Sequence, residues 1–212
     1  MNTRSGKPAF ERASNGPTGT VRIIGGHWRG TRLSVPQSPG LRPTSDRVRE
    51  TLFNWLMPVL PGARVLDLFA GSGALGLEAA SRGAGGVQLV EADPQLARAL
   101  ADTVQRLQAG AQVAVHCGDA QAYLREHPEA RFDIAFVDPP FAAGLWPQVL
   151  ALLPARMAAD AWIYLESPAE ITPQLPPEWV LHRENHTREV RYALYRRATI
   201  SASLSHGSAA TT

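Results

Sequence analysis

The feature that most constrains the fold is a regular alternation of short apolar stretches with longer helix-forming ones in the middle of the chain. The apolar stretches, which are typical of buried strands, are 64–69, 87–91, 113–116, 132–137 and 161–166. The helix-forming stretches between them are about 74–82, 94–109, 120–126 and 145–156. Strands that alternate with helices of this length form a parallel sheet covered by helices on both faces. The sequence therefore predicts an α/β fold with a mostly parallel, doubly wound sheet.

Both ends of the folded part break this alternation. Residues 179–183 and 189–195 resemble two strands without a helix between them, which predicts a C-terminal antiparallel hairpin. Residues 21–24 and 31–35 flank a glycine-rich turn and predict a small N-terminal hairpin.

A helix is expected after the N-terminal hairpin, because Thr44 or Ser45 can cap one and apolar residues recur at helical spacing up to Leu56. The two ends of the chain are rich in small and polar residues without an apolar period, which predicts disorder. The expected organisation is a disordered tail at 1–19, a basic hairpin-and-helix unit at 20–60, a main domain at 61–198 and a disordered tail at 199–212.

Positive charge is concentrated in the N-terminal unit. The chain has a net charge of +2, yet its first 62 residues contain nine Lys or Arg against three Asp or Glu. A basic arm on a mildly acidic body indicates docking on a polyanion, and guanidinium groups suit phosphates and base edges. A genome that favours arginine codons would explain arginine in place of lysine, but not the clustering. The candidate nucleic-acid contacts are Arg22, His27, Trp28, Arg29, Arg32 and Arg42, although a tryptophan at a hairpin tip serves equally well in packing.

Several classes of protein are excluded by composition. No apolar run reaches the roughly 18 residues of a membrane span, and the polar N-terminus lacks the apolar core of a secretion signal. A single cysteine, Cys117, excludes an internal disulfide and a cysteine-based zinc cluster, and the six histidines are scattered. We therefore expect a cytoplasmic protein, most simply a monomer, with no membrane contact and no bound metal.

A glycine-rich turn follows the first predicted strand of the main domain. Gly71, Gly73 and Gly76 form the pattern G-x-G-x-x-G, and Glu91 ends the next strand twenty residues after Gly71. Such glycines let a ligand approach the backbone, and the acidic side chain can accept hydrogen bonds from ribose hydroxyls. Those features fit a nicotinamide dinucleotide as well as S-adenosylmethionine.

Asp67, just before the loop, favours S-adenosylmethionine. A carboxylate there is unfavourable for a pyrophosphate, which needs the positive helix N-terminus, but it suits a ligand with an amino group and a sulfonium. A tight turn that binds nothing is the simpler alternative.

After the third strand, Asp119 either accepts from the adenine amino group or merely caps the next helix, and one side chain can do both. The predicted cofactor-binding residues are Asp67, Phe69, Gly71, Gly73, Glu91, Asp119 and Ala120.

The most specific motif is Asp138-Pro139-Pro140-Phe141, which directly follows the fourth strand. Two prolines fix the turn and remove two N–H donors, so only carbonyls remain beside the carboxylate. Such a turn can hold both hydrogens of an exocyclic –NH₂ group, while Phe141 offers a face on which a flipped base stacks. These four residues are the predicted catalytic site. A rigid loop with a capping Asp and a core Phe is the alternative.

The chemistry of an aromatic amine fits this motif. A carboxylate with an ordinary pKa near 4 is too weak a base to deprotonate the amine in advance. Hydrogen bonds from the amine to Asp138 and to the Pro139 carbonyl can instead orient the nitrogen toward the methyl group and stabilise the charge that develops on it.

With these motifs identified, the chain resembles the bacterial D-type guanine-N2 methyltransferases that modify 16S ribosomal RNA. The resemblance covers about Arg22 to Tyr195, and its distinctive stretches are 22–30, 41–56, 69–79 and 136–141. It implies a Rossmann-like S-adenosylmethionine-dependent methyltransferase fold that modifies one guanine in the assembled 30S subunit. It also implies that 41–56 closes over the methionine end of the cofactor, so that Thr44, Asp46 and Arg47 contact either the cofactor or RNA.

Three other functions remain open. An N6-adenine DNA methyltransferase shares the Asp-Pro-Pro-Phe motif, but so short a chain has no room for a separate target-recognition domain. A nicotinamide-dependent oxidoreductase would use the same glycine loop. A non-catalytic RNA-binding protein on a degenerate methyltransferase fold is disfavoured by the intact Asp138.

Overall fold

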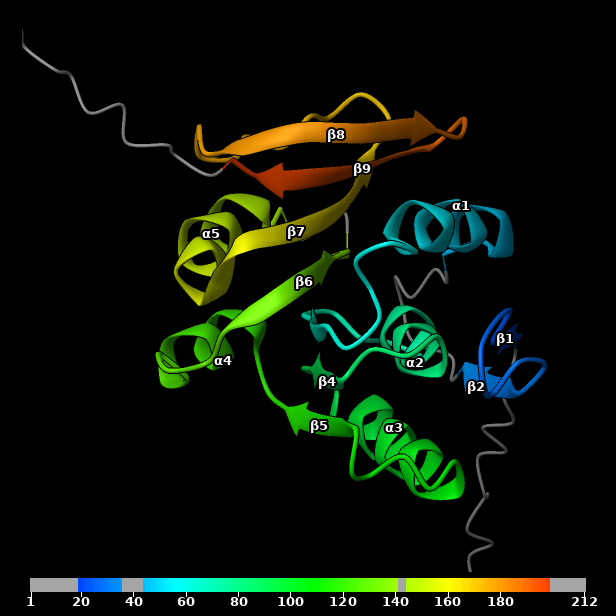
Figure 1. Cartoon of the computed structure of the whole chain (residues 1–212). Helices are drawn as coiled ribbons and strands as arrows, with labels where there is room; N and C mark the ends of the chain where they lie inside the picture. Colours follow the sequence, from blue (N-terminus) through cyan, green and yellow to red (C-terminus); the bar gives the residue numbers. More distant parts are fainter. Residues whose placement is uncertain (1–18, 36–43, 141–143, 199–212) are drawn as a thin grey trace, which may run out of the picture.

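The computed structural model describes residues 19–35, 44–140 and 144–198 (Figure 1). Its centre is a seven-stranded sheet with the strand order β5-β4-β3-β6-β7-β9-β8. The strands are β3 (Arg64–Asp67), β4 (Gly86–Glu91), β5 (Val113–Cys117), β6 (Phe132–Val137), β7 (Met157–Pro168), β8 (Trp179–His186) and β9 (Val190–Arg197). The first five are parallel, and β9 is antiparallel to both of its neighbours. This confirms the predicted Rossmann-like sheet with its C-terminal antiparallel hairpin.

The strand order reverses at β3. The chain runs outward from β3 through β4 to β5, and then returns to place β6 on the other side of β3. Loops that leave β3 and β6 therefore diverge, and they open a crevice at the carboxyl ends of these two strands. In sheets of this kind, ligands bind at that crevice.

Helices cover both faces of the sheet (Figure 1). One face is covered by α1 (Asp46–Leu56), α2 (Ala74–Ser81) and α3 (Pro94–Arg106), and the other by α4 (Ala120–Glu126), α5 (Trp146–Leu152) and a 3₁₀ turn (Leu153–Arg156). Side chains alternate between the two cores along each strand, as strand geometry requires. On β6, Ile134 and Phe136 pack toward the first set of helices, whereas Ala135 and Val137 pack toward the second.

Element boundaries differ from the predicted ones for identifiable reasons. The predicted helix 145–156 divides before Pro154, because proline lacks the N–H that would continue the α-helical pattern. The fifth strand is longer than 161–166, since Met157 already pairs with Phe132. Ser45, one of the two predicted caps, accepts a hydrogen bond from the Val48 N–H and so caps α1.

The N-terminal hairpin consists of β1 (Gly19–Arg22) and β2 (Arg32–Val35), an antiparallel pair outside the main sheet. It begins one residue inside the segment for which the sequence predicts disorder. The turn of the hairpin lies against the end of α2, where the His27 N–H donates to the Ser81 carbonyl at 2.7 Å and the Trp28 N–H donates to Ser81 Oγ at 2.9 Å. These bonds satisfy a helix terminus that would otherwise need water. Residues 1–18 and 199–212, which include both predicted disordered tails apart from Gly19, lie outside the described residues.

A buried ionic network joins the hairpin, α1 and α2. Arg49 on α1 is fully buried, donates to the Arg22 carbonyl at 2.7 Å, and lies 3.8 Å from the carboxylate of Glu78 on α2. Glu78 is also fully buried and accepts from the Ile24 N–H and from Arg82. One carboxylate thus compensates two guanidinium groups and a backbone donor of the hairpin. The N-terminal unit also shares its apolar core with the main domain, through residues such as Ile23 and Phe53.

The substitution Glu78→Gln should therefore destabilise the protein strongly, because it removes the buried carboxylate shared by Arg49 and Arg82 and leaves Arg49 with the exposed Asp46 as its remaining acidic partner. Breaking a buried pair in this way costs about 3–5 kcal/mol. Urea unfolding followed by tryptophan fluorescence measures the change. As a control, Asp133→Asn removes the exposed partner of Arg64 and should cost less than about 1 kcal/mol. Equal losses in the two variants would contradict a structural role for the buried network.

Candidate active site

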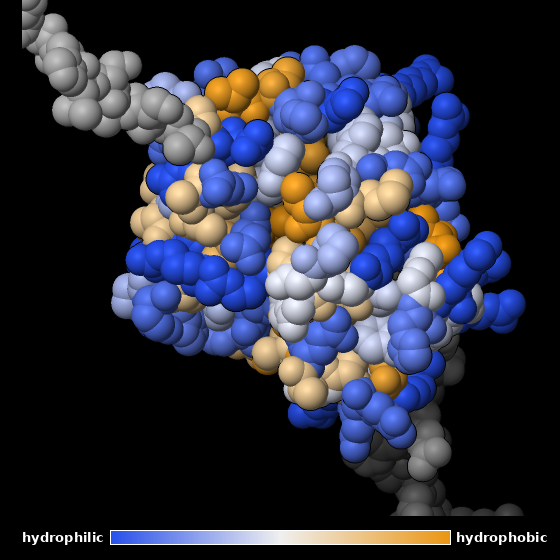
Figure 2. Space-filling model, viewed as in Figure 1, coloured by the Kyte–Doolittle hydropathy of each residue, from blue (hydrophilic) through white to orange (hydrophobic). Residues whose placement is uncertain are grey.

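A cavity of about 710 Å³ opens at the carboxyl edge of the sheet, at the point where the strand order reverses. Its size suits a small-molecule ligand. It is lined by residues at the ends of β3 to β7, at the start of α1, and in the turn between β8 and β9. Figure 2 shows that the face seen there is largely hydrophilic, with a band of apolar side chains near its middle. The predicted site residues that line the cavity are Asp67, Phe69, Gly71, Glu91, Asp119, Ala120, Asp138, Pro139 and Pro140.

The glycine loop is built as its sequence predicts. Gly73 is the N-cap of α2 and has a φ of 78°, in the left-handed region that glycine adopts without strain. A Cβ at Gly76 would lie 2.2 Å from Leu89 Cδ2, so only glycine allows α2 to pack this closely on β4. Gly73 is buried beneath the loop rather than on the cavity wall, so it shapes the site without lining it.

Asp67 ends β3 beneath this loop. One of its carboxylate oxygens accepts a hydrogen bond from the Gly76 N–H at 2.9 Å, and the residue is only 3% exposed. Burial raises the pKa of Asp67 to about 7, and the nearby charge of Glu91 adds to the rise, while hydrogen bonds from the backbone of Gly76 and Phe69 oppose it. Asp67 is thus a buried carboxylate on the cavity wall, held by backbone donors rather than by a basic side chain of the described residues.

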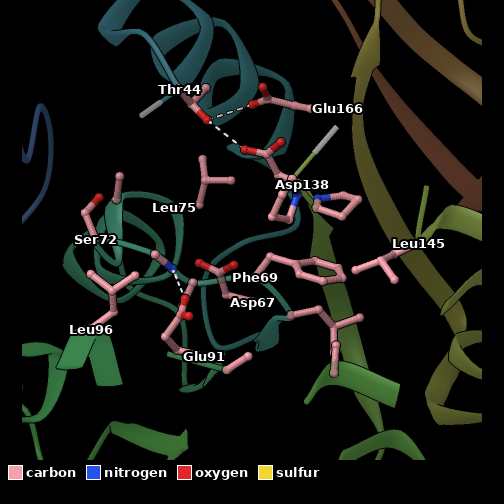
Figure 3. Close-up of a pocket in the computed structure, with 18 of the residues that line it drawn as sticks. Thr44, Asp67, Phe69, Ser72, Leu75, Glu91, Leu96, Asp138, Leu145 and Glu166 are labelled. Carbon is pink, nitrogen blue, oxygen red and sulfur yellow. Dashed lines mark hydrogen bonds between the residues drawn. The ribbon is translucent and has the colours of Figure 1, made fainter. Parts of the chain in front are cut away.

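Glu91 holds the other side of the loop. Its two oxygens accept from the Gly71 N–H and the Asp93 N–H, each at 2.8 Å, and the first of these bonds is drawn in Figure 3. Each carboxylate oxygen can accept a second hydrogen bond, so Glu91 can still accept from the hydroxyls of a ligand.

Asp119 is the N-cap of α4. Its Oδ1 accepts from the N–H groups of Gln121 and Ala122, both at 2.9 Å, which confirms the capping role considered for it. Asp119 also lines the cavity, so the structure is compatible with both roles at once.

Asp138 and the two prolines reach the cavity from the end of β6, and Phe141 lies outside the described residues. Val137 on β6 pairs with Leu165 on the parallel strand β7, so the next residues, Asp138 and Glu166, are neighbours across the two strands. The Thr44 hydroxyl lies 2.8 Å from Glu166 Oε1 and 3.4 Å from Asp138 Oδ2 (Figure 3). Burial raises the pKa of Asp138 well above its usual value, the charges of Glu166 and Asp67 raise it further, and the hydrogen bond from Thr44 lowers it.

Glu166 is a site residue that sequence reasoning missed. It is 5% exposed, lines the cavity, and its Oε1 accepts from Thr44 and from the Tyr164 hydroxyl, each at 2.8 Å. Burial raises the pKa of Glu166, while the two hydrogen bonds lower it. The available signal was its place: like Asp67 and Glu91, it is an acidic residue at the carboxyl end of an apolar strand.

The structure separates the predicted RNA contacts from the cavity. The hairpin turn that contains His27, Trp28 and Arg29 binds the C-terminal end of α2, whereas the cavity lies at the N-terminal end of this helix. An eight-residue helix is about 12 Å long. His27 and Arg29 are exposed, Trp28 packs partly against the core, and the exposed Arg22 and Arg32 face each other on β1 and β2. Arg42 lies outside the described residues.

The three candidate contact residues near the start of α1 also differ in whether they line the cavity. Thr44 lines the cavity, whereas Asp46 binds Arg49 at 2.6 Å and Arg47 is exposed to solvent. Of these three residues, only Thr44 belongs to the cavity wall.

Comparison with known proteins identifies the family. The family model described as "Conserved hypothetical protein 95" matches residues 21–196. The ribosomal RNA small subunit methyltransferase D of Escherichia coli is 47% identical over 191 residues, which cover 89% of this chain and 96% of the relative. The chain belongs to the small-subunit methyltransferase D family.

Two more relatives agree with this assignment. The methyltransferase D of Haemophilus influenzae is 42% identical over 84% of this chain and 94% of its own length. The solved structure of the putative methyltransferase yhhF from Escherichia coli is 48% identical and superimposes with a TM-score of 0.76, covering 85% of this chain and 99% of the other. The family's methyltransferase fold is thus the fold of this chain.

Two further features of the described residues concern membranes and metal ions. None of the helices in this part of the chain combines the length and apolar character needed to cross a bilayer. Among the same residues, no three His, Cys, Asp or Glu side chains are arranged to hold a metal ion.

The raised pKa of Asp67 leads to a prediction about stability. The folded chain binds the Asp67 proton more tightly than the unfolded chain does, since the pKa is about 7 in one and about 4 in the other. The free energy of unfolding therefore loses a contribution as the pH rises from about 4 to about 7. In Asp67→Asn residue 67 does not titrate, so the free energy of unfolding of the variant does not fall in this way. It should exceed that of the wild type by up to about 4 kcal/mol at pH 8, and by progressively less at lower pH. Urea unfolding from pH 5 to 8 measures the difference, and a difference independent of pH would contradict the assignment.

Proposed function

We propose that this chain is an S-adenosylmethionine-dependent methyltransferase that modifies the exocyclic N2 amine of one guanine in 16S rRNA within the assembled 30S subunit. The observation that supports it most directly is the rigid Asp138-Pro139-Pro140 turn on the wall of a cavity large enough for a cofactor. The names of the relatives in Escherichia coli and Haemophilus influenzae support an rRNA of the small subunit as the substrate. The choice of guanine and of the assembled subunit comes from the family resemblance described above.

The side chains of the cavity fit S-adenosylmethionine. Asp67 and Glu91 offer carboxylates beside the glycine loop, and Asp119 offers another at the end of β5. Carboxylates stabilise the amino group and the sulfonium of this cofactor, and they accept hydrogen bonds from its ribose hydroxyls and its adenine amine. The same carboxylates would repel the pyrophosphate of a dinucleotide. When bound, the cofactor supplies an electrophilic methyl group.

Residues of this chain position the amine that acts as the nucleophile and accept the proton that it releases. Asp138 and the Pro139 carbonyl accept the two hydrogens of the amine, which orients its nitrogen toward the methyl group. During transfer of the methyl group to the amine, positive charge would develop on the nitrogen beside the Asp138 carboxylate, which would stabilise it. Because burial raises the pKa of Asp138, this carboxylate is also a better acceptor for the released proton than an exposed aspartate.

The N-terminal hairpin is the proposed RNA-docking surface. Arg22 and Arg32 are exposed and occupy paired positions on β1 and β2, and the exposed Arg29 lies in the turn between these strands. Guanidinium groups in such positions can neutralise backbone phosphates without reading a base. Docking there would hold the RNA on the α2 side of the molecule while the target base reaches the cavity.

The first test of this function is the substitution Asp138→Ala. It should lower transfer from labelled S-adenosylmethionine to 30S subunits of a strain lacking the gene by at least about 100-fold, because the amine loses its acceptor. Cofactor affinity, measured by calorimetry, should change little.

Asp133→Ala, which removes an exposed carboxylate from the same strand, is the matched control and should leave transfer intact. Label on duplex DNA and none on the 30S particles would instead support an N6-adenine DNA methyltransferase, and tighter binding of NADH than of S-adenosylmethionine would support an oxidoreductase.

The second test concerns docking. The double substitution Arg22→Gln with Arg32→Gln should weaken binding to 30S subunits and reduce the slope of log K against log salt by about two. The control is the double substitution Arg125→Gln with Arg131→Gln. These two exposed residues lie at the end of α4 and just before β6, so the control removes the same charge but should leave the slope unchanged. Equal effects of the two doubles in filter binding would place the RNA elsewhere.

A further inference from the structure

We infer that Glu166 is the residue that selects guanine, by accepting the N1–H of the same base whose N2 amine is held by Asp138. This inference rests on the proposed function, in which a base amine reacts at Asp138. It begins from the carboxylate pair itself: Asp138 and Glu166 follow paired residues on two parallel strands, and both line the cavity. The Thr44 hydroxyl lies within 3.4 Å of an oxygen of each carboxylate, so the two carboxylates are neighbours on the cavity wall (Figure 3).

The charge of the cavity supports this assignment. Its described lining contains six carboxylates, Asp67, Glu91, Asp93, Asp119, Asp138 and Glu166, and no Arg, Lys or His. Donors that satisfy these carboxylates must come from backbone, from hydroxyl groups or from what binds in the cavity. Asp67, Glu91 and Asp119 lie beside the glycine loop and β5, whereas Asp138 and Glu166 lie together at the ends of β6 and β7. A ligand group that binds there therefore needs donors of its own, separate from those that face the glycine loop.

The Watson–Crick edge of guanine supplies such a set. It presents the N1–H beside the N2 amine, so two neighbouring donor groups meet two neighbouring carboxylates. Adenine presents an N1 lone pair beside its N6 amine, and this lone pair would face the Glu166 carboxylate. Sites built to bind a substrate N–H reject an analogue without it by large factors, because a buried polar group is then left unpaired.

The hydrogen bonds of Glu166 leave it free for this role. The hydroxyls of Thr44 and Tyr164 both donate to Oε1, and these two hydrogen bonds partly offset burial, which raises the pKa of Glu166. Oε2 retains its capacity to accept. A purely structural glutamate on β7 would not need to line the cavity, as Glu166 does.

The test uses 2-aminopurine, which keeps the 2-amine but has a lone pair at N1. 30S subunits are reconstituted with 16S rRNA that carries either guanine or 2-aminopurine at the target position. Wild-type enzyme should methylate the guanine subunits at least about 100-fold faster. In Glu166→Gln the amide can donate to an N1 lone pair, so the guanine rate should fall and the preference should drop below about tenfold.

Tyr164→Phe is the matched control. It removes one hydrogen bond to Glu166 Oε1 but leaves the carboxylate on the cavity wall, so the guanine preference should stay within about threefold of the wild type. Circular dichroism and calorimetry with S-adenosylmethionine verify that each variant folds and binds the cofactor. If Tyr164→Phe lost the preference as fully as Glu166→Gln, the inference would be overturned, since the hydrogen-bond network rather than the carboxylate would set it.

The wild-type measurement alone separates the role of Glu166 from the proposed function. Equal rates on guanine and 2-aminopurine overturn the role of Glu166 while leaving the proposed methyltransferase intact, whether or not Glu166→Gln folds. Transfer to neither kind of 30S particle overturns the proposed function, and this inference with it.

Discussion

The constraint on which the rest of the structure depends is the crowding of carboxylates around one cavity without basic side chains among its described lining residues. Uncompensated buried charge is costly, and the raised pKa values of Asp67, Asp138 and Glu166 express that cost. Such a site persists only where the surrounding fold is stable enough to tolerate it. The same carboxylates attract ligands rich in N–H donors or positive charge, which is the chemistry required by a methyl-transfer cofactor and an amine.

The fold compensates this charge with backbone rather than with side-chain cations. Four helices begin at the cavity: α1 after Ser45, α2 after Gly73, α3 after Asp93 and α4 after Asp119. Their N-termini carry the positive ends of helix dipoles and N–H groups that have no acceptor within the helix, and Ser45, Asp93 and Asp119 accept from some of these N–H groups. Glu91 and Asp67 accept directly from N–H groups of the glycine loop. Because every βα turn places a helix start at the carboxyl edge, the parallel topology itself makes an acidic cavity sustainable.

The parallel β/α topology also explains which residues of the cavity could be predicted from the sequence. Asp67, Glu91, Asp119 and Asp138 could be placed from the sequence, because each follows an apolar strand whose position the β/α alternation determines. Glu166 occupies an equivalent place, but no motif surrounds it, and its pairing with Asp138 depends on a strand register that the sequence does not reveal. The docking of the hairpin turn on α2 was likewise hidden, because it is made by backbone N–H groups and Ser81 rather than by a patterned side chain.

Thr44 connects the N-terminal unit to the candidate active site. Its hydroxyl donates to Glu166 at 2.8 Å and lies 3.4 Å from Asp138, and Thr44 directly precedes α1, which is held by the Arg49–Glu78 network outside the cavity. That network joins α1 to both α2 and the hairpin, so the proposed RNA-docking arm and the residue that contacts both carboxylates belong to one connected unit. In this arrangement the register of β6 and β7 places the two acceptors side by side, while the N-terminal unit supplies the hydroxyl that contacts both of them.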